Sequence, residues 1–219
     1  MVSPAPLAAR PLNERFVERL LRCVTGLTGF GIGIAFFVQA DVGVPPWDVF
    51  HQGVAGKVGW GLGTVIIATG FVLLLLWIPL RIRPGIGTVL NAVQIGLVEN
   101  LAEGIIPDAT TPVVQVSFVA AGMVSIALGS GLYIGAELGS GPRDGLMMGL
   151  HGRFGISVRV ARTSVEVAAM VVGVLLGGTI GIGTFVFALG IGPMVQVTLA
   201  LLRMKPSQLD RATSEALEQ

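Results

Sequence analysis

Long hydrophobic runs separated by short polar turns dominate the pattern of this chain. No charged residue falls within positions 65–80, 112–136 or 167–202. A helix needs about 20 apolar residues to cross a bilayer, so the last run, 36 residues long, holds two crossings with a turn at GGTIGIG. The pattern therefore predicts six transmembrane helices, over residues 20–40, 60–80, 86–105, 113–136, 158–177 and 183–203.

Two further helices are predicted that are too short to cross the bilayer unaided. They cover residues 45–58 and 142–154, and glycines interrupt both of them. Each begins with a proline in its first turn, Pro46 or Pro142, followed two positions later by an aspartate. Proline fits the first turn of a helix and a carboxylate is favoured at the positive end of the helix dipole. We expect re-entrant or interfacial half-helices.

The chain is similar to itself at an offset of 96 positions. The stretch GVPPWDVFHQGVAGKVG from Gly43 lies over GSGPRDGLMMGLHGRFG from Gly139, and GIGT at 85–88 lies over GIGT at 181–184. This similarity indicates a duplicated unit with three spans and one short helix. Because three is odd, the two units have opposite orientations in the membrane, which is a common architecture of transporters. The expected fold is thus an all-α polytopic membrane protein built from two inverted three-helix repeats.

The predicted boundaries follow from these elements. Residues 1–19 form an N-terminal segment, 20–106 the first repeat, 113–203 the second repeat and 204–219 a C-terminal tail. With six crossings, thirteen of the fourteen Lys and Arg residues lie on the side of the N-terminus, and Lys57 alone lies on the other side. The positive-inside rule then predicts a bacterial plasma (inner) membrane protein with both termini in the cytoplasm.

Composition supports a membrane protein and excludes several kinds of site. Hydrophobic residues make up 53% of the chain and charged residues 12%, against about 25% charged residues in soluble domains. One cysteine and two histidines argue against a metal cluster and a disulfide. We expect no metal, no cofactor, no nucleic-acid partner and no enzymatic activity. The lipid bilayer is the expected partner, and the glycine-rich helix faces also allow a homo-oligomer.

The acidic residues at the short-helix starts are candidate binding groups. Asp48 and Asp144 could bind a cation or a proton or hold a gate, or they could simply complement the helix dipole, worth about 0.3–1 kcal/mol each. Arg143, the residue that corresponds to Trp47, could pair with Glu137 or Asp144 or capture an anionic substrate. Trp47 itself suits an interfacial anchor.

The fifth span carries the most specific candidates. Arg162 and Glu166 are four residues apart and can share one helix face with Arg159. Glu166 lies about nine residues into the helix, roughly 13 Å along its axis. An ionisable group at such depth is a functional candidate with Arg162 as its partner. The alternative is an ion pair that only fixes this helix in the bundle.

Polar residues on the third span and in the glycine-rich turns complete the candidates. Asn91 and Gln94 are one helical turn apart and could line a binding site or hydrogen-bond neighbouring helices. The turns that begin at Gly85 and Gly181 could present amides to an anion, while Thr88 and Thr184 could cap the helices that follow. These turns, together with Pro46 and Pro142, are the expected gating elements.

The paired G-x-x-P-[W/R]-D motifs, the GIGT turns and six spans in about 210 residues resemble the YczE/YyaS/YitT family of bacterial integral membrane proteins. The resemblance covers about residues 18–205. It rests on Gly43, Pro46, Trp47 and Asp48, and on Gly139, Pro142, Arg143, Asp144 and 181–184. It implies a polytopic inner-membrane protein that could act as a permease, and it supplies no substrate.

Three functions fit these observations. The first is a small-molecule or ion permease with a midplane site between inverted repeats. The second is a substrate-binding membrane subunit of a larger transporter, which fits the size and the span number, although an inverted duplication is not expected of that class. The third is a non-transporting membrane accessory protein.

Overall fold

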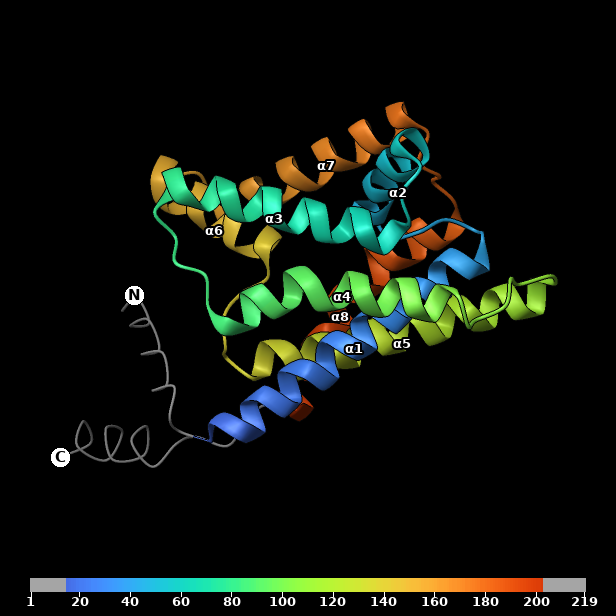
Figure 1. Cartoon of the computed structure of the whole chain (residues 1–219), viewed down its shortest axis with the longest axis horizontal. Helices are drawn as coiled ribbons and strands as arrows, with labels where there is room; N and C mark the ends of the chain where they lie inside the picture. Colours follow the sequence, from blue (N-terminus) through green and yellow to red (C-terminus); the bar gives the residue numbers. More distant parts are fainter. Residues whose placement is uncertain (1–14, 203–219) are drawn as a thin grey trace.

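The computed structural model describes residues 15–202 of the chain, which form eight α-helices connected by short turns (Figure 1). Most of the predicted N-terminal segment and the whole of the predicted tail lie outside the described residues. The helices are α1 (Phe16–Ala40), α2 (Pro46–Val58), α3 (Leu62–Leu80), α4 (Ile86–Glu103), α5 (Pro112–Gly135), α6 (Pro142–Phe154), α7 (Val158–Leu176) and α8 (Ile182–Leu202).

The helices lie where the hydrophobic pattern predicts them, with ends that differ by a few residues. Four of the eight, α1, α3, α5 and α8, are long and apolar enough to cross a membrane. Two more of the predicted spans, α4 and α7, form helices of similar length but carry more polar and charged side chains. The chain is therefore an all-helical, multi-pass membrane protein.

The centre of the bundle is the crossing of α1 and α5, which approach each other closely at glycines. A Cβ atom at Gly26 would lie 2.6 Å from the carbonyl oxygen of Gly129, and one at Gly129 would lie 2.5 Å from the carbonyl oxygen of Gly26. Gly33 and Gly122 form a second contact of the same kind. Small residues allow helix backbones to approach in this way in membrane proteins.

The other helices surround this central pair. Helix α4 packs on α1 and helix α8 packs on α5, while α3 packs on α4. The short helices bridge to more distant elements, since α2 packs mainly on α7 and α6 packs on both α3 and α7. Figure 1 shows α2 and α6 toward opposite ends of the molecule, with α3 extending between them.

The turns before the two short helices have closely similar backbones. Asp41 and Glu137 adopt left-handed conformations with φ of 50° and 54°, and Gly43 and Gly139 follow with φ of 101° and 130°. Glycine populates such positive φ values without the steric penalty of a Cβ atom. Each turn joins a GIGT segment through a backbone hydrogen bond, from Gly183 N to Val42 O (2.8 Å) and from Gly87 N to Leu138 O (2.9 Å).

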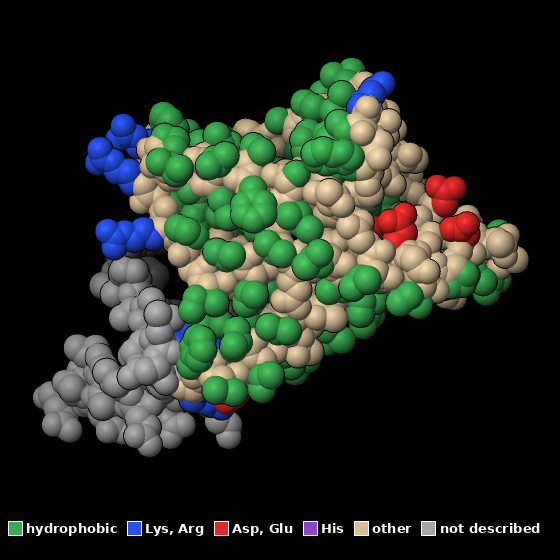
Figure 2. Space-filling view, in the orientation of Figure 1, with side chains coloured by type: hydrophobic (Ala, Val, Ile, Leu, Met, Phe, Trp, Pro, Cys, Tyr) green, Lys and Arg blue, Asp and Glu red, His purple; other side chains and the backbone are tan. Residues whose placement is uncertain are grey.

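The charged side chains on the visible face gather at its two ends. Figure 2 shows most Lys and Arg side chains at the end where the α3–α4 loop lies, and most Asp and Glu side chains at the opposite end. Hydrophobic side chains cover most of the surface between these ends. Such an apolar belt is what a bilayer requires of the helices that it surrounds.

Trp77 connects α3 to the start of α6, and its replacement should destabilise the bundle. Its indole nitrogen donates to Pro142 O (2.9 Å), and its ring packs against Gly145. Trp77→Phe leaves that buried carbonyl without its donor, at a cost of about 1–3 kcal/mol. Thermal unfolding in detergent should show the loss. The exposed Trp60 provides the control, since Trp60→Phe should change the free energy of unfolding by less than about 0.5 kcal/mol. Equal melting temperatures for both variants would contradict this role.

Candidate functional site

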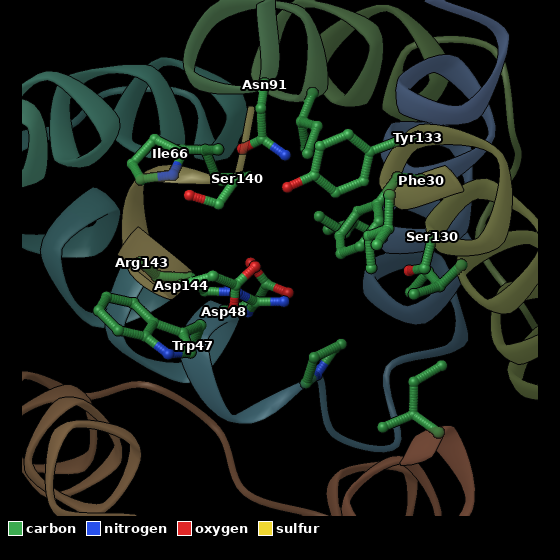
Figure 3. A pocket seen from close by; sticks show the side chains of 18 of the residues that line it. Phe30, Trp47, Asp48, Ile66, Asn91, Ser130, Tyr133, Ser140, Arg143 and Asp144 are labelled. Atoms are coloured by element: carbon green, nitrogen blue, oxygen red, sulfur yellow. The ribbon is translucent and has the colours of Figure 1, made fainter. Parts of the chain in front are cut away.

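A pocket of about 800 Å³ lies in the middle of the bundle and receives side chains from all eight helices. Its walls combine apolar and aromatic side chains with many polar and charged ones, several of which point inward (Figure 3). Ligand sites in proteins commonly have this size. Six of the seven predicted binding residues line this pocket, and they come from the four helices α2, α4, α6 and α7: Asp48, Asn91, Arg143, Asp144, Arg162 and Glu166.

The starts of both short helices face the pocket. Pro46 and Pro142 occupy the first helical turn, as predicted, and the aspartates Asp48 and Asp144 follow in the same turn. Figure 3 shows Asp48, Arg143 and Asp144 on the same side of the cavity. The helix starts thus bring two carboxylates and one guanidinium, Arg143, into the same pocket although they are about a hundred positions apart in the sequence.

Asp48 belongs to a buried polar cluster on α2. Its Oδ1 lies 2.8 Å from Nδ1 of His51, and both residues are less than 10% exposed. Trp47 is also buried and lies beside His51, with their ring centroids 6.2 Å apart. The predicted interfacial anchor at Trp47 is therefore wrong, because its indole is buried and lines the pocket. Its ring nitrogen has no hydrogen-bond partner among the described residues.

The charges at the start of α6 do not neutralise each other. Neither Arg143 nor Asp144 forms an ion pair with any residue in the described part of the chain. The Cζ atom of Arg143 lies 5.9 Å from the ring centroid of Phe30, a cation–π geometry. The predicted pairing of Arg143 with Asp144 is not formed. Both groups remain able to contact a charged ligand.

Asn91 and Gln94, predicted as possible neighbours in one site, have different surroundings. Asn91 lines the pocket opposite the start of α6, and the Tyr133 hydroxyl points into the same space (Figure 3). Gln94 is not among the residues that line the pocket. Its amide donates to Val24 O (2.8 Å) and to the Thr28 hydroxyl (2.9 Å), both on α1. Gln94 thus connects two helices and is not part of the candidate site.

Arg162 and Glu166 lie where the pocket extends between α7 and α8. Arg162 Nε and Glu166 Oε1 are 3.1 Å apart, so the predicted partnership is present, and both side chains are partly or largely exposed. Helices α7 and α8 do not pack along their length. On α8, Gly192 lines the pocket and a Cβ atom there would touch nothing within 4 Å. The pocket is therefore open on this side.

The pocket is closed between α3 and α4. The backbones of Gly63 and Gly96 are in such close contact that a Cβ atom on either glycine would collide with the carbonyl of the other. Farther along, Gly70 packs against Ala92. Asn100 strengthens this contact by accepting from Gly63 N (3.0 Å) and donating to the Thr64 hydroxyl (3.2 Å). We call the contact of α3 with α4 at Gly63 and Gly96 the α3–α4 seam.

The GIGT turns hold the pocket together and do not line it. Thr88 Oγ1 accepts from Gly85 N (3.1 Å) and Thr184 Oγ1 accepts from Gly181 N (3.3 Å), so both threonines close the helix starts. Thr184 also donates to Val44 O at 2.7 Å. The amides of Gly87 and Gly183 donate to Leu138 O and Val42 O, so these two glycine nitrogens are directed to the protein.

The arrangement can bind a small organic molecule that bears a charged group. Carboxylates would contact a cationic group and the Arg143 guanidinium an anionic one, while Phe30, Trp47 and Tyr133 supply apolar contact area. The sequence alone did not predict that Tyr133 and His51 belong to the site. Tyr133 is the only tyrosine of the chain, and an isolated polar ring in an apolar span is the signal that could have indicated it.

Comparison with known proteins places the chain in a family. Residues 17–199 match a family of unknown function, DUF6198. An uncharacterized protein of Haemophilus influenzae is 36% identical over 180 residues, which cover 82% of this chain and 83% of the relative. The uncharacterized membrane protein YczE of Bacillus subtilis is 30% identical over 194 residues, covering 86% and 88% of the two chains.

A second Bacillus subtilis protein, the uncharacterized YyaS, is 25% identical over 170 residues, covering 73% of this chain and 81% of the relative. No solved structure matches the chain. The family match spans nearly all of the described helices, and the relatives are matched over most of their own length. The chain is a multi-pass membrane protein that belongs to the DUF6198 family, together with the YczE- and YyaS-like proteins.

Proposed function

We propose that the protein is a permease of the bacterial inner membrane that moves a small charged organic solute by alternating access. The observation that carries the proposal is the unequal closure of one central pocket. The pocket is sealed at the α3–α4 seam and open between α7 and α8. Under the sequence repeat, α7 and α8 correspond to α3 and α4, so the two sides are candidates for alternate gates.

Matching contacts support two inverted repeats of three crossing helices each. Adding 96 to Gly26 and Gly33 gives Gly122 and Gly129, so the contact of Gly26 with Gly129 has its equivalent in that of Gly122 with Gly33. The turns before the two short helices also make contacts that are related by the offset of 96 positions. Gly43 lies against Gly181 and Thr184, and Gly139 lies against Gly85 and Thr88. A pseudo-two-fold axis between α1 and α5 would produce these pairs.

The charge distribution supports an orientation. In the proposed topology, α4 and α7 cross the membrane together with the four more apolar helices. Figure 2 has Lys and Arg mostly at one end of the molecule and Asp and Glu at the other. The positive-inside rule assigns the basic end to the cytoplasm. The opening between α7 and α8 then faces inward, because Arg159 and Arg162 at the start of α7 belong to the basic side.

Bridging the open side should stop transport. In a Cys23→Ala background, Ile156→Cys and Val197→Cys place thiols at exposed positions in the turn before α7 and late in α8. Proteoliposomes would be loaded with a mixture of amino acids, amines, organic acids and inorganic ions. Mass spectrometry would then follow the contents over time. We expect the unbridged protein to release one class of solute, and a bis-maleimide bridge to abolish the release.

The matched control uses the positions 96 residues earlier, Trp60→Cys and Leu101→Cys, which flank the α3–α4 seam and are also exposed. An alternating-access permease needs both sides to open, so a bridge here should also stop release. Protein labelled with a monofunctional maleimide at the same sites should remain active. Release of no solute by the unbridged protein, or release that neither bridge changes, would overturn the proposal. Copurification of stoichiometric partner subunits would favour the alternative of a substrate-binding component.

A further inference from the structure

One acidic side chain in the α3–α4 seam is buried without a partner. Glu99 on α4 has no exposed surface, and among the described residues neither Oε1 nor Oε2 has a hydrogen-bond partner. Buried polar groups in proteins are almost always hydrogen-bonded, and exceptions require an explanation. Glu99 is not among the residues that line the pocket. Its burial is therefore a feature separate from the candidate substrate site.

The backbone amide that acts on Glu99 is that of Gly63, which is shared with Asn100. A Cβ atom on Gly63 would lie 2.7 Å from Glu99 Oε2, so Gly63 is an immediate neighbour. The amide of Gly63, however, donates to Asn100 Oδ1 at 3.0 Å. The Asn100 amide in turn donates to the hydroxyl of Thr64 at 3.2 Å. The packing of α3 on α4 thus places the carboxyl group among groups that hydrogen-bond to each other.

Within residues 15–202, no cation pairs with Glu99 to compensate the charge that it would carry when ionised. The charged groups that act on it are Asp48 of α2, which is paired with His51, and Glu103 of α4 itself. From α3 the neighbours are Gly63 and, through Asn100, the hydroxyl of Thr64, neither of which is charged. An isolated carboxylate in such surroundings is so costly that the group takes up a proton instead. The closed seam therefore requires the neutral acid.

We propose that Glu99 is a proton-binding site that holds the α3–α4 seam closed when protonated and lets it open when it loses the proton to water. The step transfers one proton and breaks no other covalent bond. Ionisation favours the state in which the carboxylate is hydrated, which is the state with the seam open. As a coupling site, this inference rests on the proposed permease, but proton binding by Glu99 can be tested without transport.

Glu99 has no acidic counterpart in the equivalent helix pair, α7 and α8. The residue 96 positions later is Val195, which lines the pocket on α8 and cannot ionise. On α7, the counterparts of Gly63, Ile66 and Gly70 are Arg159, Arg162 and Glu166. The α7–α8 side thus has no equivalent of a small-residue contact sealed around a buried acid. Only the α3–α4 seam is expected to respond to protonation in this way.

Infrared difference spectroscopy of the full chain in nanodiscs tests proton binding directly. As the pH is raised, the wild type should lose the carbonyl band of a protonated carboxylic acid that lacks strong hydrogen bonds. Glu99→Gln, which resembles the neutral acid in shape and cannot ionise, should lack this band at every pH. Glu103→Gln, a control one helical turn away, should retain it. A band with the same intensity in wild type and Glu99→Gln would overturn the assignment.

Spin labels are attached at Trp60→Cys and Leu101→Cys in the Cys23→Ala background. The distribution of distances between the two labels shows whether the α3–α4 seam is closed or open. In the wild type and in Glu103→Gln, longer distances should appear over the pH range in which the infrared band disappears. Glu99→Gln and Glu99→Met should keep the short distance throughout. Distances in Glu99→Gln that follow pH as in the wild type would overturn the proposed lock. Closure of the seam at constant pH when sodium chloride replaces choline chloride would also overturn the proposed lock, because the bound ion would then be sodium.

These measurements separate the two proposals. If the infrared band titrates and the seam responds to pH, but the protein moves no solute, the proton site is supported and the permease is contradicted. If the protein releases solute, but the seam does not respond to pH and no infrared band is assigned to Glu99, the permease is supported and the proton site is contradicted.

Discussion

Gly26→Leu is expected to prevent formation of a stable bundle. A Cβ atom at this position would lie 2.6 Å from Gly129 O and 2.7 Å from Tyr133 N, both of them backbone atoms of α5. Backbone atoms in a helix cannot move aside as a flexible side chain can, and overpacking of this kind costs about 3 kcal/mol or more. Since α1 and α5 form the centre on which α4 and α8 pack, the whole arrangement depends on this contact.

The measurement is size-exclusion chromatography of the detergent-solubilised protein followed by thermal unfolding. We expect little monodisperse protein, or a melting temperature lower by about 10 °C, since 1 kcal/mol corresponds to about 2–4 °C for a chain of this size. Gly56→Ala on the exposed face of α2 is the control, because a Cβ atom there meets nothing within 4 Å. It should be neutral or stabilising by roughly 0.5–1 kcal/mol. Equal behaviour of the two variants would show that the close α1–α5 approach is not required.

Asp144→Asn is expected to weaken substrate binding strongly. Asp144 faces the central pocket and forms no ion pair within the described residues, so its charge is available to a ligand. A hydrogen bond to a charged group contributes about 1.5–3 kcal/mol, which corresponds to roughly a 10- to 100-fold change in affinity. A ligand that binds only the folded state raises the melting temperature. A thermal-shift screen of metabolites, amines, organic acids and ions would identify such a ligand.

The comparison should include Glu166→Gln and Asp41→Asn. Glu166 is paired with Arg162 at the open side, so its replacement tests whether binding extends to that pair. Asp41 is exposed in the turn after α1 and has a positive φ, a conformation that asparagine also adopts. Asp41→Asn should keep the full thermal shift at every ligand concentration. A ligand whose shift survives Asp144→Asn unchanged would place its binding site away from the start of α6.

The helices could be predicted from the sequence because each is determined by local order. Charge-free runs define the long helices, and Pro46 and Pro142 define where the short helices begin. The threonine closures of the GIGT turns were also predictable, since Thr88 and Thr184 lie three residues after the glycines whose amides they accept. These features depend on contacts within a few residues of sequence.

The surroundings of individual side chains depend on how the helices rotate against one another, which local order does not determine. Asn91 and Gln94 are one turn apart, yet one lines the pocket and the other bonds to α1. Trp47 could be read as a membrane anchor because nothing local indicates its burial. Glu99 was recognisable as a polar residue on an apolar helix, but its isolation results from the approach of Gly63 on another helix.

The paired glycine contacts between α1 and α5 have a consequence for the history of this fold. An interface in which Gly26 meets Gly129 and Gly122 meets Gly33 is complementary to its own inverted copy. Two identical chains of half this length, inserted in opposite directions, could form it before any gene duplication joined them. After fusion, each glycine faces a partner that can change separately. Differences such as Glu99 against Val195 could then accumulate in one half only, which two identical subunits could never do.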